Sequence, residues 1–531
     1  MKTVNLSKII QLVNSGSYAK AEFELKSLIN GQPNNFILNK IYGVSLMAQQ
    51  KYLKAIGAFE ICHNLNNLDY DINVNLSYLF SKTQDYKKSL MFSENSIDID
   101  ENRPEAYQNM AECYLNLKEF NKAEKYILSA IDKRGGLDST DILKFQDTLS
   151  LYGDILLAKK EKKKFCDYVF KILDKGNHFD QLLISLIRIN NDNMKKKYLD
   201  KMYDILKNIN NLKSLKSKNL TESNIYFILA EYFQKIDNHE SEKYYLKANN
   251  IIESLQRKSL YDRQKRISII LNNLKDYETQ DSGSKLLSKK GDGLIFIIGM
   301  PRSGTTLVES IISTANHCAA GGEKLFFSLE CNHQLDGENM LNLDSAFLNS
   351  LGDKYLETIA IQRDGKKFFV DKMPENFLYL GYIKKIFPAA KFVHVYRDPW
   401  DNAISLFKQN YAYNISYASS FFGIALEYAN YEHIMTYWRK GSGKIPFIDI
   451  NYEDLVSNTK LIARKIWDYC NFDGEYNEEK RDNFFSLTAS KQQVVKHIYQ
   501  TSLEKSDFSE FKTQFLEDLN QQRQYWASNV N

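Results

Sequence analysis

The chain shows two hydrophobic patterns, and the first gives way to the second near residue 290. Up to that point the sequence predicts helix after helix. Beyond it, short apolar runs typical of buried strands alternate with helical stretches; the runs are Leu294–Ile298, Lys367–Val370, Lys391–Tyr396 and Ile445–Ile450, and the helices include Leu378–Phe387 and Trp400–Gln409. Strands separated by helices predict a parallel sheet inside a three-layer α/β domain. The expected fold class is therefore α + α/β.

The helical half repeats itself every 34 residues. An aromatic residue recurs at that interval, a small residue follows each aromatic by three positions, and another small residue precedes the last three aromatics by nine positions. These are Tyr18, Tyr52, Tyr86 and Phe120; Ala21, Ala55, Ser89 and Ala123; and Gly43, Ser77 and Ala111. The period is that of tetratricopeptide (TPR) repeats, in which each unit is a helix–turn–helix. Residues from about 5 to 134 therefore resemble a TPR solenoid, in which the small residues let paired helices approach closely.

The repeat loses its phase at Arg134-Gly135-Gly136, and this break sets the expected domain boundaries. We expect TPR repeats over residues 1–134 and degenerate TPR-like helices over 135–278. Ala230 and Ser241 have a TPR-like setting there. The polar segment 279–292 contains Gly and Ser and is the expected linker. Residues 293–531 then form the α/β domain.

A glycine loop connects the first predicted strand of that domain to a helix. The segment reads LIFIIGMPRSGTTLVESIIS, with a loop from Gly299 to Gly304 and a helix from Thr305. Loop amides and the positive end of a helix dipole converge in such a connection and bind anions. The spacing nearly matches the P-loop, but Thr305 replaces its lysine and the cation lies inside the loop as Arg302. This departure disfavours an ATPase or kinase and favours another phosphate-bearing donor.

A second basic feature follows the strand that ends at Tyr396. Arg397 comes directly after it, Asp398-Pro399 is a typical helix start, and Ser405 lies about two turns into that helix. An arginine and a hydroxyl in this arrangement can hold one phosphate from two sides, because the guanidinium binds phosphate oxygens bidentately. The alternative is a structural salt bridge from Arg397 to Asp398 or Asp401.

The composition limits the possible ligands and locations of the protein. The 531 residues are 43% hydrophobic and 26% charged with a net charge of +4, so the chain is globular and no whole-chain binding of nucleic acid is expected. The six cysteines are scattered without metal-ligand spacing, so we expect free thiols and no metal. The segment MKTVNLSKIIQLVNSGS lacks the apolar core of a signal peptide, and no apolar run could span a bilayer. We therefore expect a cytoplasmic location.

The loop PRSGTT, together with Arg397 and Ser405, resembles the sulfotransferase family. The similarity covers about residues 293 to 530 and points to tyrosylprotein sulfotransferases and bacterial TPR-linked sulfotransferases. It implies 3′-phosphoadenosine-5′-phosphosulfate (PAPS) as the donor. It also implies that the first loop holds the 5′-phosphosulfate and that Arg397 and Ser405 hold the 3′-phosphate. The loop residues so assigned are Arg302, Ser303, Gly304, Thr305 and Thr306.

Further positions match the family pattern. Glu323, in AAGGEKLFF, resembles the catalytic base, and Lys372, in VDKMPEN, resembles the lysine that contacts the bridging oxygen. Ser490 resembles a serine at the sulfate end of the donor, and Tyr452 and Lys505 match donor contacts more loosely. The resemblance thus implies Glu323, Lys372, Arg302 and Ser490 as catalytic residues. Lone surface carboxylates and lysines of this kind also form ordinary pairs, such as Glu323 with Lys324 or Lys372 with Asp371. His394 lies on a buried strand pattern and is expected to be structural.

We therefore expect a PAPS-dependent sulfotransferase that acts on a hydroxyl of a protein tyrosine, a glycan or a small molecule. Its TPR groove would bind a protein or peptide partner, and an oligomer is compatible with the sequence. The alternative is a TPR scaffold with a non-catalytic nucleotide-binding domain. A third hypothesis is a nucleotide kinase or NTPase, but this chain lacks the lysine that the P-loop of such enzymes carries.

Overall fold

The described part of the chain forms two compact units. The computed structural model describes residues 6–139, 141–175, 185–186, 196–208, 215–234, 236–279, 289–335, 344–411, 415–440, 445–481, 484 and 508–529. The first unit takes in the described residues of Met1–Lys164, Leu325–Leu341 and Asp353–Gln362, and the second takes in those of Phe165–Lys324, Asn342–Gly352 and Arg363–Asn531. No described helix is both long and apolar enough to cross a bilayer.

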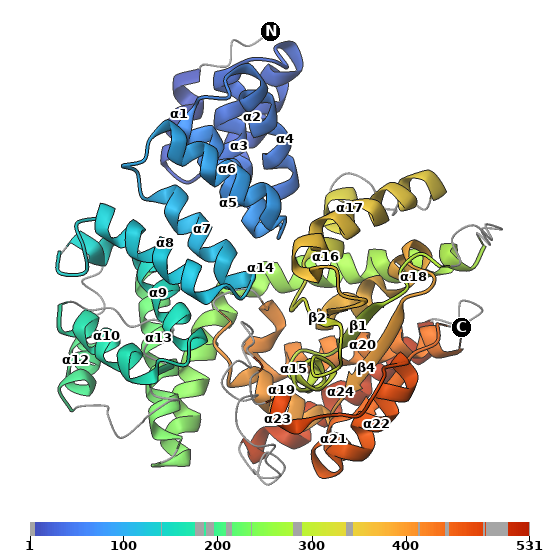
Figure 1. The fold of residues 1–531 in the computed structure, drawn as a ribbon. Coiled ribbons are helices and arrows are strands. Elements are labelled where there is room, and N and C mark those ends of the chain that lie inside the picture. Colours follow the sequence, from blue (N-terminus) through green and yellow to red (C-terminus); the bar gives the residue numbers. More distant parts are fainter. Residues whose placement is uncertain are drawn as a thin grey trace. The chain divides into compact units, whose positions relative to one another are not determined.

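The first unit begins with antiparallel helix pairs (Figure 1). Its N-terminal helices are α1 (Leu6–Asn14), α2 (Tyr18–Gly31), α3 (Phe36–Ala48), α4 (Tyr52–Leu65), α5 (Tyr70–Lys82), α6 (Tyr86–Ile99), α7 (Glu105–Asn116) and α8 (Phe120–Lys133). A short 3₁₀ turn, η1 (Asp141–Lys144), and α9 (Gln146–Ala158) follow. The same unit also contains α16 (Phe326–Leu335), which packs against α4.

The 34-residue period predicted from the sequence is confirmed in this unit. The four in-phase aromatics are the first residues of α2, α4, α6 and α8. The small residues three positions later are fully buried, and so are Ser77 and Ala111 on the partner helices. Between α5 and α6, the Ser89 hydroxyl donates to the Ser77 carbonyl at 2.7 Å, and the Ser77 and Ser93 hydroxyls lie 2.6 Å apart. Small side chains thus bring the paired helices into contact, as the repeat requires.

The second unit contributes further helices before its sheet. They are α10 (Lys162–Lys175, which begins in the first unit), α12 (Lys196–Lys207), α13 (Leu215–Phe233) and α14 (Asn238–Thr279). The Ser241 hydroxyl donates to the Ala230 carbonyl at 2.8 Å, so α13 and α14 approach as a TPR pair does. With 42 residues and a rise of about 1.5 Å per residue, α14 is roughly 60 Å long. Most of the expected linker 279–292 lies outside the described residues.

A parallel sheet forms the centre of the second unit. In the described ranges it has five strands in the order β2-β3-β1-β4-β5. They are β1 (Leu294–Gly299), β2 (Cys318–Ala320), β3 (Phe368–Asp371), β4 (Lys391–Tyr396) and β5 (Ile448–Asn451). The parallel α/β sheet is thus confirmed. The sequence missed β2, which has only three residues, and β5 begins later than expected because Pro446 cannot donate to a strand ladder.

Helices cover both faces of this sheet. Val393 and Val395 of β4 pack with α15 (Thr305–Ile312) and α22 (Thr459–Cys470) on one face, whereas His394 points to the other face and contacts α20 (Phe421–Lys440). The remaining elements are α17 (Ser345–Arg363), η5 (Pro374–Tyr379), α18 (Leu380–Ile386), α19 (Pro399–Phe407), η6 (Ser416–Ser419), α21 (Tyr452–Ser457), α23 (Glu478–Arg481) and α24 (Ser509–Asn529).

The close approach of repeat helices predicts a difference between two glycines. A Cβ atom at Gly43 of α3 would lie 2.8 Å from the buried Phe59 ring, whereas a Cβ at Gly57 of α4 would meet no atom within 4 Å. Gly43→Leu should therefore lower the free energy of unfolding by about 1–3 kcal/mol through overpacking. Gly57→Leu is the matched control and should be neutral or stabilising, because leucine favours helix. Urea denaturation followed by circular dichroism measures both; equal stabilities would contradict the packing.

Candidate active site

The glycine loop after β1 has the backbone of an anion cradle. Gly299 (φ 150°), Arg302 (φ 68°) and Gly304 (φ 103°) all adopt positive φ, and a positive φ at a non-glycine residue such as Arg302 is strained. Gly304 is the N-cap of α15 and offers no side chain to cap the helix. The Ser303 side chain is 1% exposed, and its hydroxyl finds no hydrogen-bond partner among the described residues. Amides at the start of α15 and this hydroxyl suit a bound anion.

The end of β4 lies beside this loop. Parallel pairing places Gly299 of β1 opposite Val395 of β4, so the segments that follow the two strands meet. An Arg397 guanidinium nitrogen lies 3.5 Å from the Arg302 carbonyl, a weak hydrogen bond. Arg302 Nε in turn donates to the Ser405 hydroxyl at 3.1 Å. The structure therefore brings together the predicted loop arginine, the strand-end arginine and the helix hydroxyl.

Tyr452 joins the same group. Its ring lies 4.6 Å from the centre of the Arg397 guanidinium, as in a cation–π contact. The same ring packs on Gly304, where a Cβ atom would lie 2.4 Å from the nearest ring carbon. Thr305 and Thr306 begin α15 and are buried. Arg397 Nε is buried without a hydrogen-bond partner in the part of the chain that the structure describes. Its N–H group could therefore donate a hydrogen bond to a ligand.

The predicted base and cation form an ion pair at the ends of two other strands. Lys372 follows β3, and its Nζ lies 2.5 Å from Glu323 Oε1, while the Lys372 amide donates to the Gly322 carbonyl at 2.9 Å. The Lys372 side chain is 0% exposed and that of Glu323 is 41% exposed. A carboxylate open to solvent thus stands directly beside a buried ammonium.

Several supporting residues were not identified from the sequence. Glu309 of α15 accepts from the Gly322 amide at 2.9 Å and so fixes the segment that carries Glu323. Asn402 donates to the Pro301 carbonyl at 3.0 Å, and the Tyr428 hydroxyl donates to the Arg397 carbonyl at 2.6 Å. A lone charge inside the apolar helix pattern of LVESII was the available signal for Glu309.

Two of the predicted donor contacts cannot be placed. Ser490 and Lys505 lie outside the described residues. Within the described ranges, no cluster of three or more His, Cys, Asp or Glu side chains is arranged to hold a metal ion.

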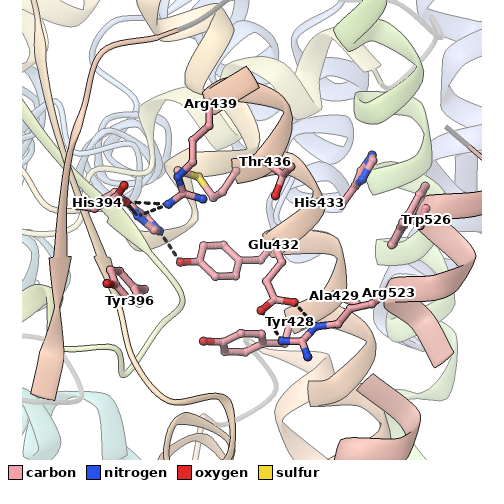
Figure 2. A pocket seen from close by; sticks show the side chains of 14 residues that line it. His394, Tyr396, Tyr428, Ala429, Glu432, His433, Thr436, Arg439, Arg523 and Trp526 are labelled. Carbon is pink, nitrogen blue, oxygen red and sulfur yellow. Dashed lines mark hydrogen bonds and ion pairs between the residues drawn. The ribbon is translucent and has the colours of Figure 1, made fainter. Parts of the chain in front are cut away.

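A cavity of about 650 Å³ lies on the face of the sheet that α20 covers (Figure 2). It is bounded by β4, β5, α20 and α24, and its wall includes His394, Tyr428, Arg439 and Trp526. His394 is 2% exposed; it lies 2.5 Å from Asp449, bonds the Tyr431 hydroxyl through its other ring nitrogen, and is therefore a satisfied core histidine, as expected. Burial lowers the pKa of His394 below its ordinary value, although Asp449 acts to raise it.

This histidine predicts a pH effect on stability. The unfolded chain protonates His394 near pH 6.5, whereas the folded protein does so only at lower pH, so stability falls as the pH falls through this window. The slope from one such proton reaches about 1.4 kcal/mol per pH unit. Between pH 7 and 5, the His394→Gln variant should therefore lose less stability than the wild type in urea titrations. The exposed His239→Gln is the control, and parallel curves for wild type and His394→Gln would contradict the assignment.

Comparison with known proteins agrees with this geometry. A profile described as the Sulfotransferase family matches residues 295–476. An uncharacterized protein of Aquifex aeolicus is 32% identical over 232 residues, which cover 40% of this chain and 30% of that protein. Protein-tyrosine sulfotransferase 1 of Danio rerio is 29% identical over 129 residues, covering 22% of this chain and 36% of that protein. The chain thus spans about a third of the length of these curated relatives.

Among solved structures, the sulfotransferase domain of the Synechococcus PCC 7002 olefin synthase aligns with a TM-score of 0.33 and 18% identity, covering 47% of this chain and 99% of that domain. The family match spans the glycine loop, Glu323, Lys372, Arg397 and Tyr452. A helical region with the 34-residue TPR period thus precedes, in this chain, a segment that matches the sulfotransferase family model over residues 295–476.

Proposed function

We propose that this protein transfers a sulfuryl group from PAPS to a hydroxyl acceptor. The observation that carries the proposal is the convergence of Arg302, Ser405 and Arg397 at one edge of the sheet. PAPS carries a phosphosulfate at one end and a 3′-phosphate at the other. It therefore needs two anion-binding sites close enough for one nucleotide to occupy both. The helix start at Gly304 and the arginine after β4 supply groups suited to each.

The residues present fit such a donor. The buried Ser303 hydroxyl and Arg397 Nε lack partners in the described ranges, which is costly unless a ligand uses them. We assign the 5′ end of the donor to the loop Arg302–Thr306 and the 3′-phosphate to Arg397 and Ser405. Tyr452 would flank the nucleotide. Ser490 and Lys505 are assigned to the donor on family resemblance alone.

The chemistry follows from the Glu323–Lys372 pair. An acceptor oxygen forms a bond to sulfur while the bond from sulfur to the bridging phosphate oxygen breaks. The acceptor proton goes to Glu323, and the leaving phosphate gains negative charge that Lys372 and Arg302 stabilise. Carboxylates are in general much weaker bases than the phenolate that they would generate. Proton transfer should therefore accompany formation of the sulfur–oxygen bond rather than precede it.

The helical repeats would recruit the acceptor or a protein partner. TPR-type solenoids present concave surfaces suited to peptides. The relatives named protein-tyrosine sulfotransferases favour a tyrosine hydroxyl as one candidate acceptor, with glycans and small molecules as the other classes. The cytoplasmic location and any oligomeric state remain predictions of the sequence, and so do the domain boundaries at 134, 278 and 292.

Donor binding gives the first test. Isothermal titration calorimetry with 3′-phosphoadenosine 5′-phosphate (PAP) should show saturable binding to the wild type. Arg397→Ala removes a charge-assisted contact and should weaken binding at least about 10-fold, since such contacts contribute about 1.5–3 kcal/mol. Arg464→Ala, on the exposed side of α22, is the matched control. Failure of the wild type to bind PAP would refute the proposal.

Catalysis gives the second test. Lys372→Met keeps the length of the buried side chain and removes its charge, so it should lower kcat by about 10²- to 10³-fold, in line with losses of oxyanion-stabilising donors. PAP affinity should change much less, because the lysine acts mainly on charge that develops in the transition state. Transfer of ³⁵S from PAPS to proteins and metabolites of a cell extract measures the rate. A loss below about threefold would exclude Lys372 from this role.

A further inference from the structure

One long helix from the helical half contacts the elements that carry the candidate active site. Near its N-terminal part, Asn249 of α14 donates to the carbonyl of Phe407, the last residue of α19, which also carries Ser405; the distance is 2.8 Å. Further along, Gln264 accepts from Asn430 of α20 at 2.9 Å. Between these contacts, α14 directs one of its arginines toward α20 and η5.

That arginine, Arg263, joins two carboxylates from separate elements. It binds Glu427 of α20 through two nitrogens, at 3.1 and 2.6 Å, and Glu375 of η5 at 2.7 Å. Its guanidinium also lies 4.8 Å from the centre of the Tyr417 ring. Burial acts to lower the pKa of Arg263, but the two carboxylates raise it well above its ordinary value. The arginine is therefore charged and fixed in place.

Both carboxylates are close in sequence to proposed active-site residues. Glu375 comes three residues after Lys372 in DKMPEN, and it lies in the first turn of η5. Glu427 precedes Tyr428, whose hydroxyl holds the Arg397 carbonyl. The Glu427 side chain is 0% exposed, so removing Arg263 would leave a buried carboxylate uncompensated near a second one. The segment after Lys372 would then lose the contact that draws it toward α14.

We propose that Arg263 is a positioning residue that holds the Lys372 segment in its active geometry through Glu375. The expected effect of Arg263 on the catalytic rate rests on the proposed function. Its role in holding the segment after Lys372 does not. It makes α14 a part of the catalytic machinery rather than a spacer before it. Any ligand or partner that displaces α14 would then change the rate through the same arginine.

Hydrogen–deuterium exchange tests whether Arg263 holds the segment after Lys372, and it needs no assay of sulfuryl transfer. In Arg263→Met, and in the milder Glu375→Gln, amides of residues 372–379 should exchange at least several-fold faster than in the wild type. Amides of α15 should not change, because the hydrogen bonds of Arg263 go to Glu427 and Glu375 on other elements. Arg257→Met is the matched control, because Arg257 is exposed on the same helix. Unchanged exchange at 372–379 in both Arg263→Met and Glu375→Gln would overturn the proposal.

Kinetics test the catalytic half. Glu375→Gln should lower kcat about 10- to 100-fold, the range expected for slight misplacement of a catalytic group, while the Kd for PAP stays within about twofold. In a Lys372→Met background the same substitution should cost less than about threefold, because the group that it positions is gone. Equal losses in both backgrounds would show a merely structural role. If the wild type bound no PAP and transferred no sulfate, the proposed function would fail, and the exchange result would still decide whether Arg263 holds this segment.

Discussion

The parallel pairing of β1 with β4 is the constraint on which the candidate site depends. It sets Gly299 opposite Val395, so the loop after one strand and the arginine after the other emerge at the same edge of the sheet. Neither segment alone distinguishes a sulfuryl-transfer enzyme from other phosphate-binding proteins. Their meeting sets the glycine loop beside Arg397, as the proposed binding of one nucleotide by both requires, and Glu323 and Lys372 form their ion pair after the neighbouring strands β2 and β3.

Backbone conformation and buried hydrogen bonds maintain this arrangement. Arg302 keeps a strained positive φ, which a fold retains only when its surroundings determine it. Asn402 holds the loop carbonyl of Pro301, Glu309 holds Gly322, and Tyr428 holds Arg397. Each of these bonds joins a segment of the candidate site to a packed helix. The result is a preorganised polar edge, which is what stabilisation of developing charge requires.

Local patterns allowed much of the fold to be predicted. The 34-residue period predicted the repeated helix pairs, and short, mostly apolar runs located β1, β3 and β4, because burial on both faces leaves a strong signal. The three-residue β2 carried too little pattern to be recognised. The glycine loop and Arg397 were identifiable because each follows a predicted strand directly, whereas Lys372 was identified by its resemblance to the family's lysine in VDKMPEN.

Long-range partners could not be predicted in this way. Glu427 lies 164 positions from Arg263 and Glu375 lies 112 positions from it, and no local period links such residues. Only packing of α14 into the second unit brings them together. For the same reason the sequence did not reveal that α14, from the helical region before the expected linker, packs in the same compact unit as the sheet.

In the proposed site, two separate groups of residues bind opposite ends of one nucleotide. The most direct test compares the calorimetric Kd of the wild-type protein for PAP with its Kd for adenosine 5′-monophosphate, which lacks only the 3′-phosphate. PAP should bind at least about 100-fold more tightly, the equivalent of roughly 2.7 kcal/mol. Equal affinities for the two nucleotides would contradict it.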